Sequence, residues 1–177
     1  MFRSIDVFLR YFDGLNRRTM RDVAALPQEA DGWAPGRGEG ENAWGINQIV
    51  GHMAATRLYF ASAYRDEGWL SPPNPDVSSR DRWLPAIEQS AHDLKGRLSS
   101  TPDDWLERKV PMLDSDGTLA GWRILMMLVE HEVHHRSQID TYAGLNDWEP
   151  PQIYERTWEQ VTALQASERA RQSETGA

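Results

Sequence analysis

Residues 122–139 read WRILMMLVEHEVHHRSQI, and every other inference from the sequence starts from this stretch. Its first half is apolar nearly all round a helix, which predicts the most buried helix of the protein. Its second half holds three of the five histidines, His131, His134 and His135. On a helix, His131 and His135 project from one face, about 6 Å apart along the axis. The stretch therefore predicts a buried helix that carries a cluster of imidazoles.

Helical periodicity recurs through the chain, and we see no convincing run of strand alternation. Leu84, Ile87, Ala91, Leu94 and Leu98 form a seam at steps of three and four, which is typical of packing in a bundle. We expect an all-α domain over residues 1–166 and a flexible tail at 167–177. The expected helices cover about residues 4–25, 46–64, 81–99 and 119–145, with a short extra C-terminal helix that starts at a capping box at Thr157.

Three long connections join these helices, at 26–45, 65–80 and 100–118. The first holds five glycines, two prolines, Trp33 and Trp44. Loops of this length in a compact domain are often functional, although a lid of tryptophans that seals one end of a bundle explains it equally well. In the third connection, Asp116-Gly117 is a weak signal for a hairpin between 110–112 and 118–119.

Composition narrows the classes of function. The chain has 177 residues, no cysteine and a formal net charge of −8, with a pI near 5.1. The missing cysteines exclude disulfides, thiolate metal sites and a cysteine nucleophile. The acidic balance argues against nucleic acid and anionic membranes as partners, and no apolar run approaches the roughly 20 residues of a membrane span. We expect a cytoplasmic protein, because Asp6 and Asp13 interrupt the apolar N-terminal stretch and exclude a signal peptide.

The spacing of His131 and His135 lets two imidazoles chelate one metal ion. His52, on another predicted helix, is the best third ligand, although a lone histidine near an apolar face is usually part of the core. Polar histidines at a helix C-terminus are the alternative interpretation. We expect His134 either to contact the ligand residues without binding the metal or to face solvent. We expect His92 to be exposed to solvent. Side chains predicted to line the same cavity are Tyr59, Gln138 and Tyr142.

Residues 131–135 also match H-E-x-x-H, the zinc-protease signature with Glu132 as general base. Such proteases bind substrate along a sheet edge, and no strand run precedes this helix. A peptidase therefore stays a minor alternative. Glu132 and His134 are the catalytic candidates if the metal site activates water.

The histidine pattern resembles the DinB/YfiT-like superfamily. The matching residues are His52 in 49–53 and the run 131–139, and residues 150–154 are similar to the C-terminal segment of the family. Members usually have glycine where Ser137 stands. The resemblance implies a four-helix bundle with up-down-down-up order and a long crossover. It also implies one divalent metal per chain on His52, His131 and His135, and frequent homodimers.

Known activities in that superfamily include S-transferases and isomerases that use low-molecular-weight thiols. We therefore expect a metal-dependent enzyme for a small-molecule substrate, with zinc or nickel first among the metals and a thiol as a further cofactor. The alternatives are a metal-dependent hydrolase and a non-catalytic, ligand-binding stress-response protein. A nucleic-acid protein comes last, because the arginines at 17, 18 and 21 fit an ordinary solvated helix face.

Overall fold

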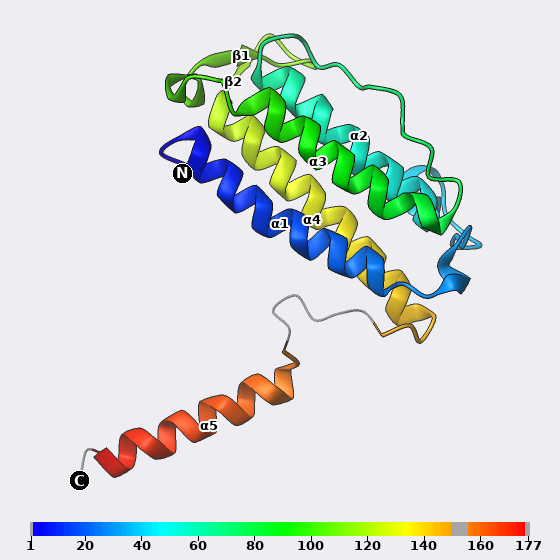
Figure 1. Cartoon of the computed structure of the whole chain (residues 1–177), viewed down its shortest axis with the longest axis vertical. Helices are drawn as coiled ribbons and strands as arrows, with labels where there is room; N and C mark the ends of the chain where they lie inside the picture. Colours follow the sequence, from blue (N-terminus) through cyan, green and yellow to red (C-terminus); the bar gives the residue numbers. More distant parts are fainter. Residues whose placement is uncertain (1, 150–155, 176–177) are drawn as a thin grey trace.

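Four long helices pack side by side as a bundle (Figure 1) in a computed structural model that describes residues 2–149 and 156–175. They are α1 (Ile5–Ala25), α2 (Ile46–Tyr64), α3 (Trp83–Leu98) and α4 (Gly121–Leu145). Ser4 caps α1 as predicted, since its hydroxyl accepts a hydrogen bond from the Val7 amide. The all-α class and the four main helices predicted from periodicity are confirmed.

The chain direction in the bundle is up-down-down-up, with residues 65–80 crossing back along its length (Figure 1). The Arg65 guanidinium donates to the carbonyl of Arg97, so α2 and α3 end at the same side. Arg80, just before α3, donates to the carbonyl of Leu26 just after α1. Helix α3 therefore begins where α1 ends, as the resemblance implied.

Short elements close the two ends of the bundle. Strands β1 (Lys109–Pro111) and β2 (Thr118–Ala120) form the small hairpin that Asp116-Gly117 indicated. Single 3₁₀ turns occupy the connections, at Gln28–Ala30 (η1), Gly40–Ala43 (η2), Arg80–Arg82 (η3) and Asp103–Leu106 (η4). A Cβ on Gly121 would lie 2.1 Å from the carbonyl oxygen of Trp105, so only glycine lets α4 begin this close to η4.

The core has two apolar halves. One lies toward the hairpin and includes Phe8, Phe12, Phe60, Leu94 and Leu128. The other lies toward the opposite end and includes Val23, Ile49, Met53, Trp83 and Ile139. Of the apolar run on α4, Ile124, Leu125, Leu128 and Val129 are buried within the single chain, whereas Trp122, Met126 and Met127 are partly exposed.

A buried polar layer draws on all four helices. Arg57 of α2 and Glu132 of α4 form a two-pronged ion pair, at 2.9 Å from Nε and 2.5 Å from Nη2. Thr19 of α1 donates to the same carboxylate at 2.6 Å, and Arg57 also donates to Ser90 of α3 at 3.1 Å. Each of these side chains is almost fully buried. Because a buried charge is costly without its partner, the layer fixes how the helices are turned and aligned.

Helix α5 (Trp158–Thr175) stands apart from the bundle in Figure 1. It begins at the predicted capping box, in which the Thr157 hydroxyl accepts from the Gln160 amide and the Gln160 side chain accepts from the Thr157 amide. A flexible tail was predicted from residue 167 onward, but in the structure the helix continues to Thr175. Residues 150–154, which resemble the family's C-terminal segment, lie outside the described residues.

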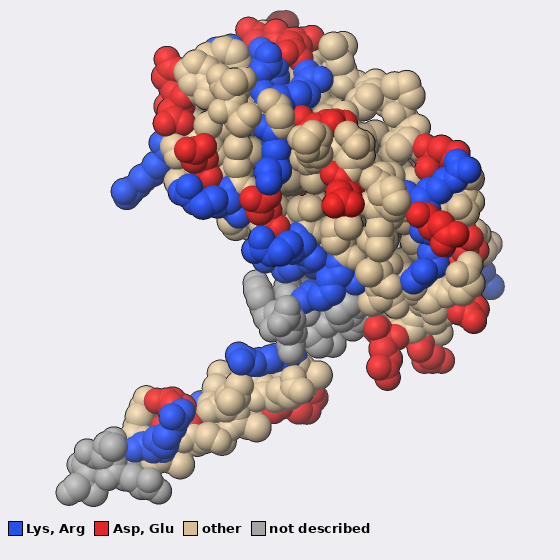
Figure 2. All heavy atoms as spheres, in the orientation of Figure 1, with Lys and Arg blue, Asp and Glu red and all other residues tan. Residues whose placement is uncertain are grey.

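Acidic and basic side chains are interspersed on the face of the molecule in Figure 2. Among the described helices, none is both long and apolar enough to span a membrane.

The substitution Glu132→Gln tests the buried layer. It leaves the Arg57 guanidinium without its counter-charge, and breaking a buried pair costs about 3–5 kcal/mol. We expect the midpoint of thermal unfolding to fall by about 10 °C. The matched control is Glu130→Gln, because Glu130 pairs with Arg123 at the exposed surface of the same helix. Circular dichroism melts of equal midpoint for the two variants would contradict the role given to this layer.

Candidate metal centre

Three histidines from two helices meet at one point between α2 and α4. The Nε2 atom of His131 lies 3.0 Å from Nε2 of His52 and 3.2 Å from Nε2 of His135. His135 is buried, and the other two are half-buried. The structure thus brings together the three histidines that were predicted as metal ligands. His92, on α3, is exposed.

Hydrogen bonds behind two of these rings fix which nitrogen carries the proton. The Gln138 amide nitrogen donates to the backbone carbonyl of Glu41, so its oxygen must be the atom 3.1 Å from His135 Nδ1. That oxygen only accepts, and Nδ1 of His135 therefore holds the proton. Likewise, the Thr56 hydroxyl donates to the carbonyl of His52 and is left to accept from His131 Nδ1, at 3.3 Å.

His131 and His135 therefore both present an unprotonated Nε2 to the centre of the cluster, and these two atoms lie 3.2 Å apart. A cation bound by both nitrogens would remove the repulsion between their lone pairs. A tetrahedral zinc ion with bonds of about 2.05 Å holds neighbouring nitrogens about 3.3 Å apart. The donor set, its spacing and its hydrogen-bonded outer partners therefore fit a divalent ion of the zinc or nickel type.

The electrostatics of the cluster keep the rings neutral. Burial, followed by the neighbouring His135, His52 and His134, lowers the pKa of His131 to about 3. Burial is also the largest cause that lowers the pKa of His52 and of His135. The Glu41 carboxylate acts in the opposite direction on both, but more weakly. Neutral imidazole is the form that binds metal, so no proton has to leave at neutral pH.

The long connection at 26–45 covers the open side of the cluster. Trp44 packs against His52 and His135, with ring centroids 4.8 and 6.1 Å apart. Gly45 makes this possible, because a Cβ there would lie 2.5 Å from the carbonyl oxygen of Trp33. Trp33 itself packs on Tyr142 and Trp148. The tryptophans are thus both a lid over the bundle end and a wall of the candidate site.

Glu132 does not face the histidines, although it is the residue next to His131. Arg57 and Thr19 occupy both of its oxygens inside the core, and the side chain is 2% exposed in the folded chain. The prediction that Glu132 could act as a general base at this site is therefore wrong on geometry. The peptidase alternative requires Glu132 as its general base, so the same geometry argues against it.

Glu41 is the carboxylate that lies beside the cluster, and sequence reasoning missed it. Ligand atoms of Glu41, His134 and His135 all lie within 4.8 Å of one another, and Glu41 and His134 are exposed. Glu41 belongs to η2, in the glycine-rich connection, where no periodicity indicates which way a side chain points. Thr56 was also missed, but its place four residues after His52 could have indicated a shared helix face.

The predicted lining residues separate into two groups. Gln138 and Tyr142 lie behind His135, where the Tyr142 hydroxyl accepts from the Gln138 amide at 3.1 Å. They position that ring instead of lining open space. Tyr59 lies two helical turns beyond His52 and lines a different cavity, next to the hairpin.

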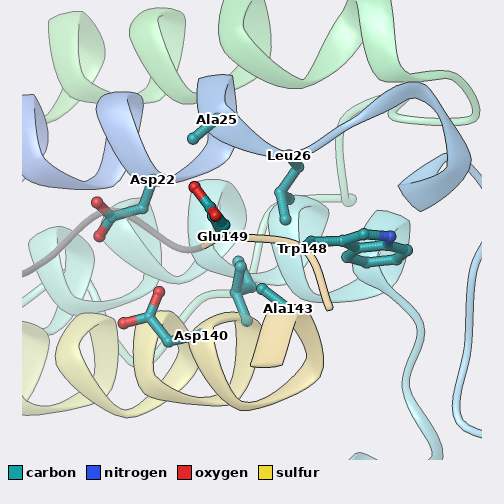
Figure 3. A pocket seen from close by; sticks show the side chains of 8 residues that line it. Asp22, Ala25, Leu26, Asp140, Ala143, Trp148 and Glu149 are labelled. Carbon is teal, nitrogen blue, oxygen red and sulfur yellow. The ribbon is translucent and has the colours of Figure 1, made fainter. Parts of the chain in front are cut away.

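A further small pocket lies between the ends of α1 and α4 (Figure 3), and three carboxylates, of Asp22, Asp140 and Glu149, line it. Asp22 forms a buried ion pair with Arg136 of α4. Burial, and secondly the Asp22 charge, raises the pKa of Asp140. These contacts tie α1 to α4, and we assign the pocket a structural role.

Comparison with known proteins places this arrangement in a family. The model of the DinB family matches residues 1–172. A DinB-like protein from Bacillus cereus has a similar structure, with a TM-score of 0.68 and 17% identity, covering 86% of this chain and 99% of that one. A DinB-like protein from Bacillus subtilis has a TM-score of 0.62 and 15% identity, covering 84% and 99%. No curated protein matches the sequence.

The two solved structures, at such low identity, support the fold alone. The family match spans almost the whole chain, including the bundle and its three converging histidines. On this evidence, the chain belongs to the DinB family.

Proposed function

We propose that this protein binds one divalent metal ion through His52, His131 and His135, and that it is a metal-dependent enzyme for a small molecule. The single observation that carries the proposal is the convergence of three imidazole Nε2 atoms, with those of His131 and His135 unprotonated and 3.2 Å apart. A divalent cation bound by these nitrogens accounts for their close approach.

A divalent ion on three neutral imidazoles supplies Lewis acidity, which lowers the pKa of a water or a thiol that binds it. The residues of the chain do the rest. Gln138 and Thr56 hold the rings in the right tautomer, and Trp44 excludes water from one side. Three protein ligands leave a coordination position open, as catalytic zinc sites do.

Our first candidate reaction is thiol transfer or thiol-assisted isomerisation, as family resemblance suggests. In the transfer, a low-molecular-weight thiol would lose its proton and form a carbon–sulfur bond with an electrophilic substrate, while the bond from that carbon to the leaving group breaks. The thiolate is itself the nucleophile, so the chain need not provide a strong base.

Hydrolysis is the second candidate, and the placement of Glu41 and His134 favours it. Both groups lie beside His135 on the exposed side of the cluster, where a proton from an attacking water could be accepted. We place it second because neither group is fixed by a hydrogen bond to a ligand ring among the described residues.

Metal content decides the first part of the proposal. We expect about one zinc or nickel ion per chain in the wild-type protein, measured by mass spectrometry of the purified protein after dialysis. His52→Ala and His135→Ala should lose nearly all of it, because two ligands cannot hold the ion tightly. His134→Ala is the matched control, one residue away from a ligand, and should keep its metal. Equal metal content in all three variants would refute the site.

The metal-free protein should become less stable as the pH falls below about 6.5. The unfolded chain takes up a proton on His131 near its ordinary pKa of 6.5, whereas the folded chain resists until about pH 3. Between these values protonation favours unfolding. In EDTA, urea unfolding should lose at least about 1 kcal/mol between pH 7.5 and 5.0, after discounting for partial exposure.

The variant His131→Gln isolates this contribution, since it removes the titrating ring. Its loss of stability between the two pH values should be smaller than that of the wild type, whereas His92→Gln should behave like the wild type. An identical pH dependence in His131→Gln and wild type would mean that the buried cluster does not resist protonation.

A paired assay separates the two reactions. Zinc-loaded protein is incubated with 1-chloro-2,4-dinitrobenzene, with and without cysteine as the thiol, and separately with p-nitrophenyl acetate. Thiol transfer predicts turnover of the chloroarene only when thiol is present, with little effect of Glu41→Gln. Hydrolysis predicts ester turnover without thiol that falls at least about tenfold in Glu41→Gln. Ester turnover alone would reverse our order of candidates.

A further inference from the structure

A second cavity, of about 150 Å³, lies between the hairpin and the groove of α2 and α4. Its lining combines two aromatic rings, two thioethers, one carboxylate and two leucines, contributed by Tyr59, Trp69, Met112, Met127, Asp114, Leu113 and Leu119. We call this cavity the hairpin cup. It is separate from the lid formed by Trp44, and the candidate metal site does not use its residues.

The hairpin cup lies along the same groove as the histidines. Met127 precedes His131 by one turn of α4, about 6 Å along the axis, and Tyr59 follows His52 by two turns of α2, about 10 Å. Because α2 and α4 run in opposite directions, both displacements point the same way. Phe60 lies between the histidines and the hairpin cup. The centroid of its ring is 5.6 Å from that of His131 and 5.3 Å from that of Tyr59.

The aromatic walls of the cup are held in place. The indole N–H of Trp69 donates to the carbonyl of Pro111 in β1, at 2.9 Å, which ties this ring to the hairpin. Its ring packs against Tyr59 at 5.3 Å and at an angle of 50°. The faces of aromatic rings carry negative electrostatic potential, which attracts a positively charged guest.

The carboxylate of Asp114 lines the cup from an exposed position and has no basic partner among the described residues. In the part of the chain that the structure describes, no lysine or arginine pairs with it, and no cation lies over the ring of Tyr59 or Trp69. Burial, and secondly the charge of Asp114, raises the pKa of Tyr59. The carboxylate thus acts on the same space as the rings, and both would be complemented by a positive charge.

We propose that the hairpin cup binds an organic ammonium group. Aromatic faces, polarisable sulfur atoms and an unpaired carboxylate are the chemistry that recognises alkylated ammonium ions. The next step alone rests on the proposed function: the substrate of the metal site places its cationic end in the cup. Its reacting group then lies about 6–10 Å away, at the histidines.

Choline and its neutral isostere 3,3-dimethylbutan-1-ol test the proposal, because they share a shape and differ in charge. Titration followed by calorimetry and by the indole N–H resonance of Trp69, assigned with Trp69→Phe, should show choline binding at least fivefold more tightly. Asp114→Asn should weaken choline binding at least fivefold and leave the alcohol unchanged. Asp116→Asn removes the same charge from the same hairpin, outside the cup, and should change choline binding less than twofold.

Equal binding of choline and the alcohol would show an apolar cavity and overturn the proposal. An equal effect of Asp114→Asn and Asp116→Asn would also overturn it, since only the overall field would then matter. The titrations are run in EDTA and again with zinc. Choline binding in a protein that takes up no zinc supports the cup and refutes the metal site, whereas zinc uptake without choline binding refutes the cup alone.

Discussion

The ion pair between Arg57 and Glu132 is the interaction on which the rest of the structure depends. It joins α2 to α4 in the interior, and Thr19 and Ser90 extend it to the other two helices. Apolar side chains tolerate sliding and rotation, because dispersion and hydrophobic burial have little direction. A buried two-pronged ion pair does not, since any slip leaves a charge without its partner.

The same constraint sets the geometry of the candidate metal centre. Glu132 is adjacent to His131 in sequence, and Arg57 lies one and a half turns after His52. Once Glu132 points inward to Arg57, His131 and His135 must face α2 at the level of His52. The ion pair therefore contributes to the site through alignment of the two helices, while its own carboxylate takes no part in the chemistry.

The groove between α2 and α4 holds two differently built spaces. At the histidines, neutral rings with inward lone pairs and a tryptophan wall fit a metal ion. Toward the hairpin, aromatic rings and an unpaired carboxylate fit an organic cation. Both spaces are closed by connections between helices: the first by residues 26–45, the second by the turn between β1 and β2. The bundle thus carries the histidines, and the connections between its helices line both spaces.

Sequence alone determined the four main helices, because the period of the apolar residues is a local property of each segment. It also predicted the histidine trio, since the spacing of His131 and His135 puts both on one helix face, His52 was the best third candidate on another helix, and the resemblance supported the same three residues. The hairpin followed from a single turn dipeptide.

Tertiary structure decided what depends on contacts between segments far apart in the chain. The partners of Glu132 lie on α1 and α2, so no local pattern could show that it is a buried ion-pair group instead of a base. The approach of Glu41 and Trp44 to the histidines depends on the backbone path of a glycine-rich loop, which has no periodicity to read. Asp114 and Trp69 line one cavity because the hairpin lies against the segment after α2, where Trp69 donates to the carbonyl of Pro111. The sequence does not show this path of the chain or the side-chain packing that holds it.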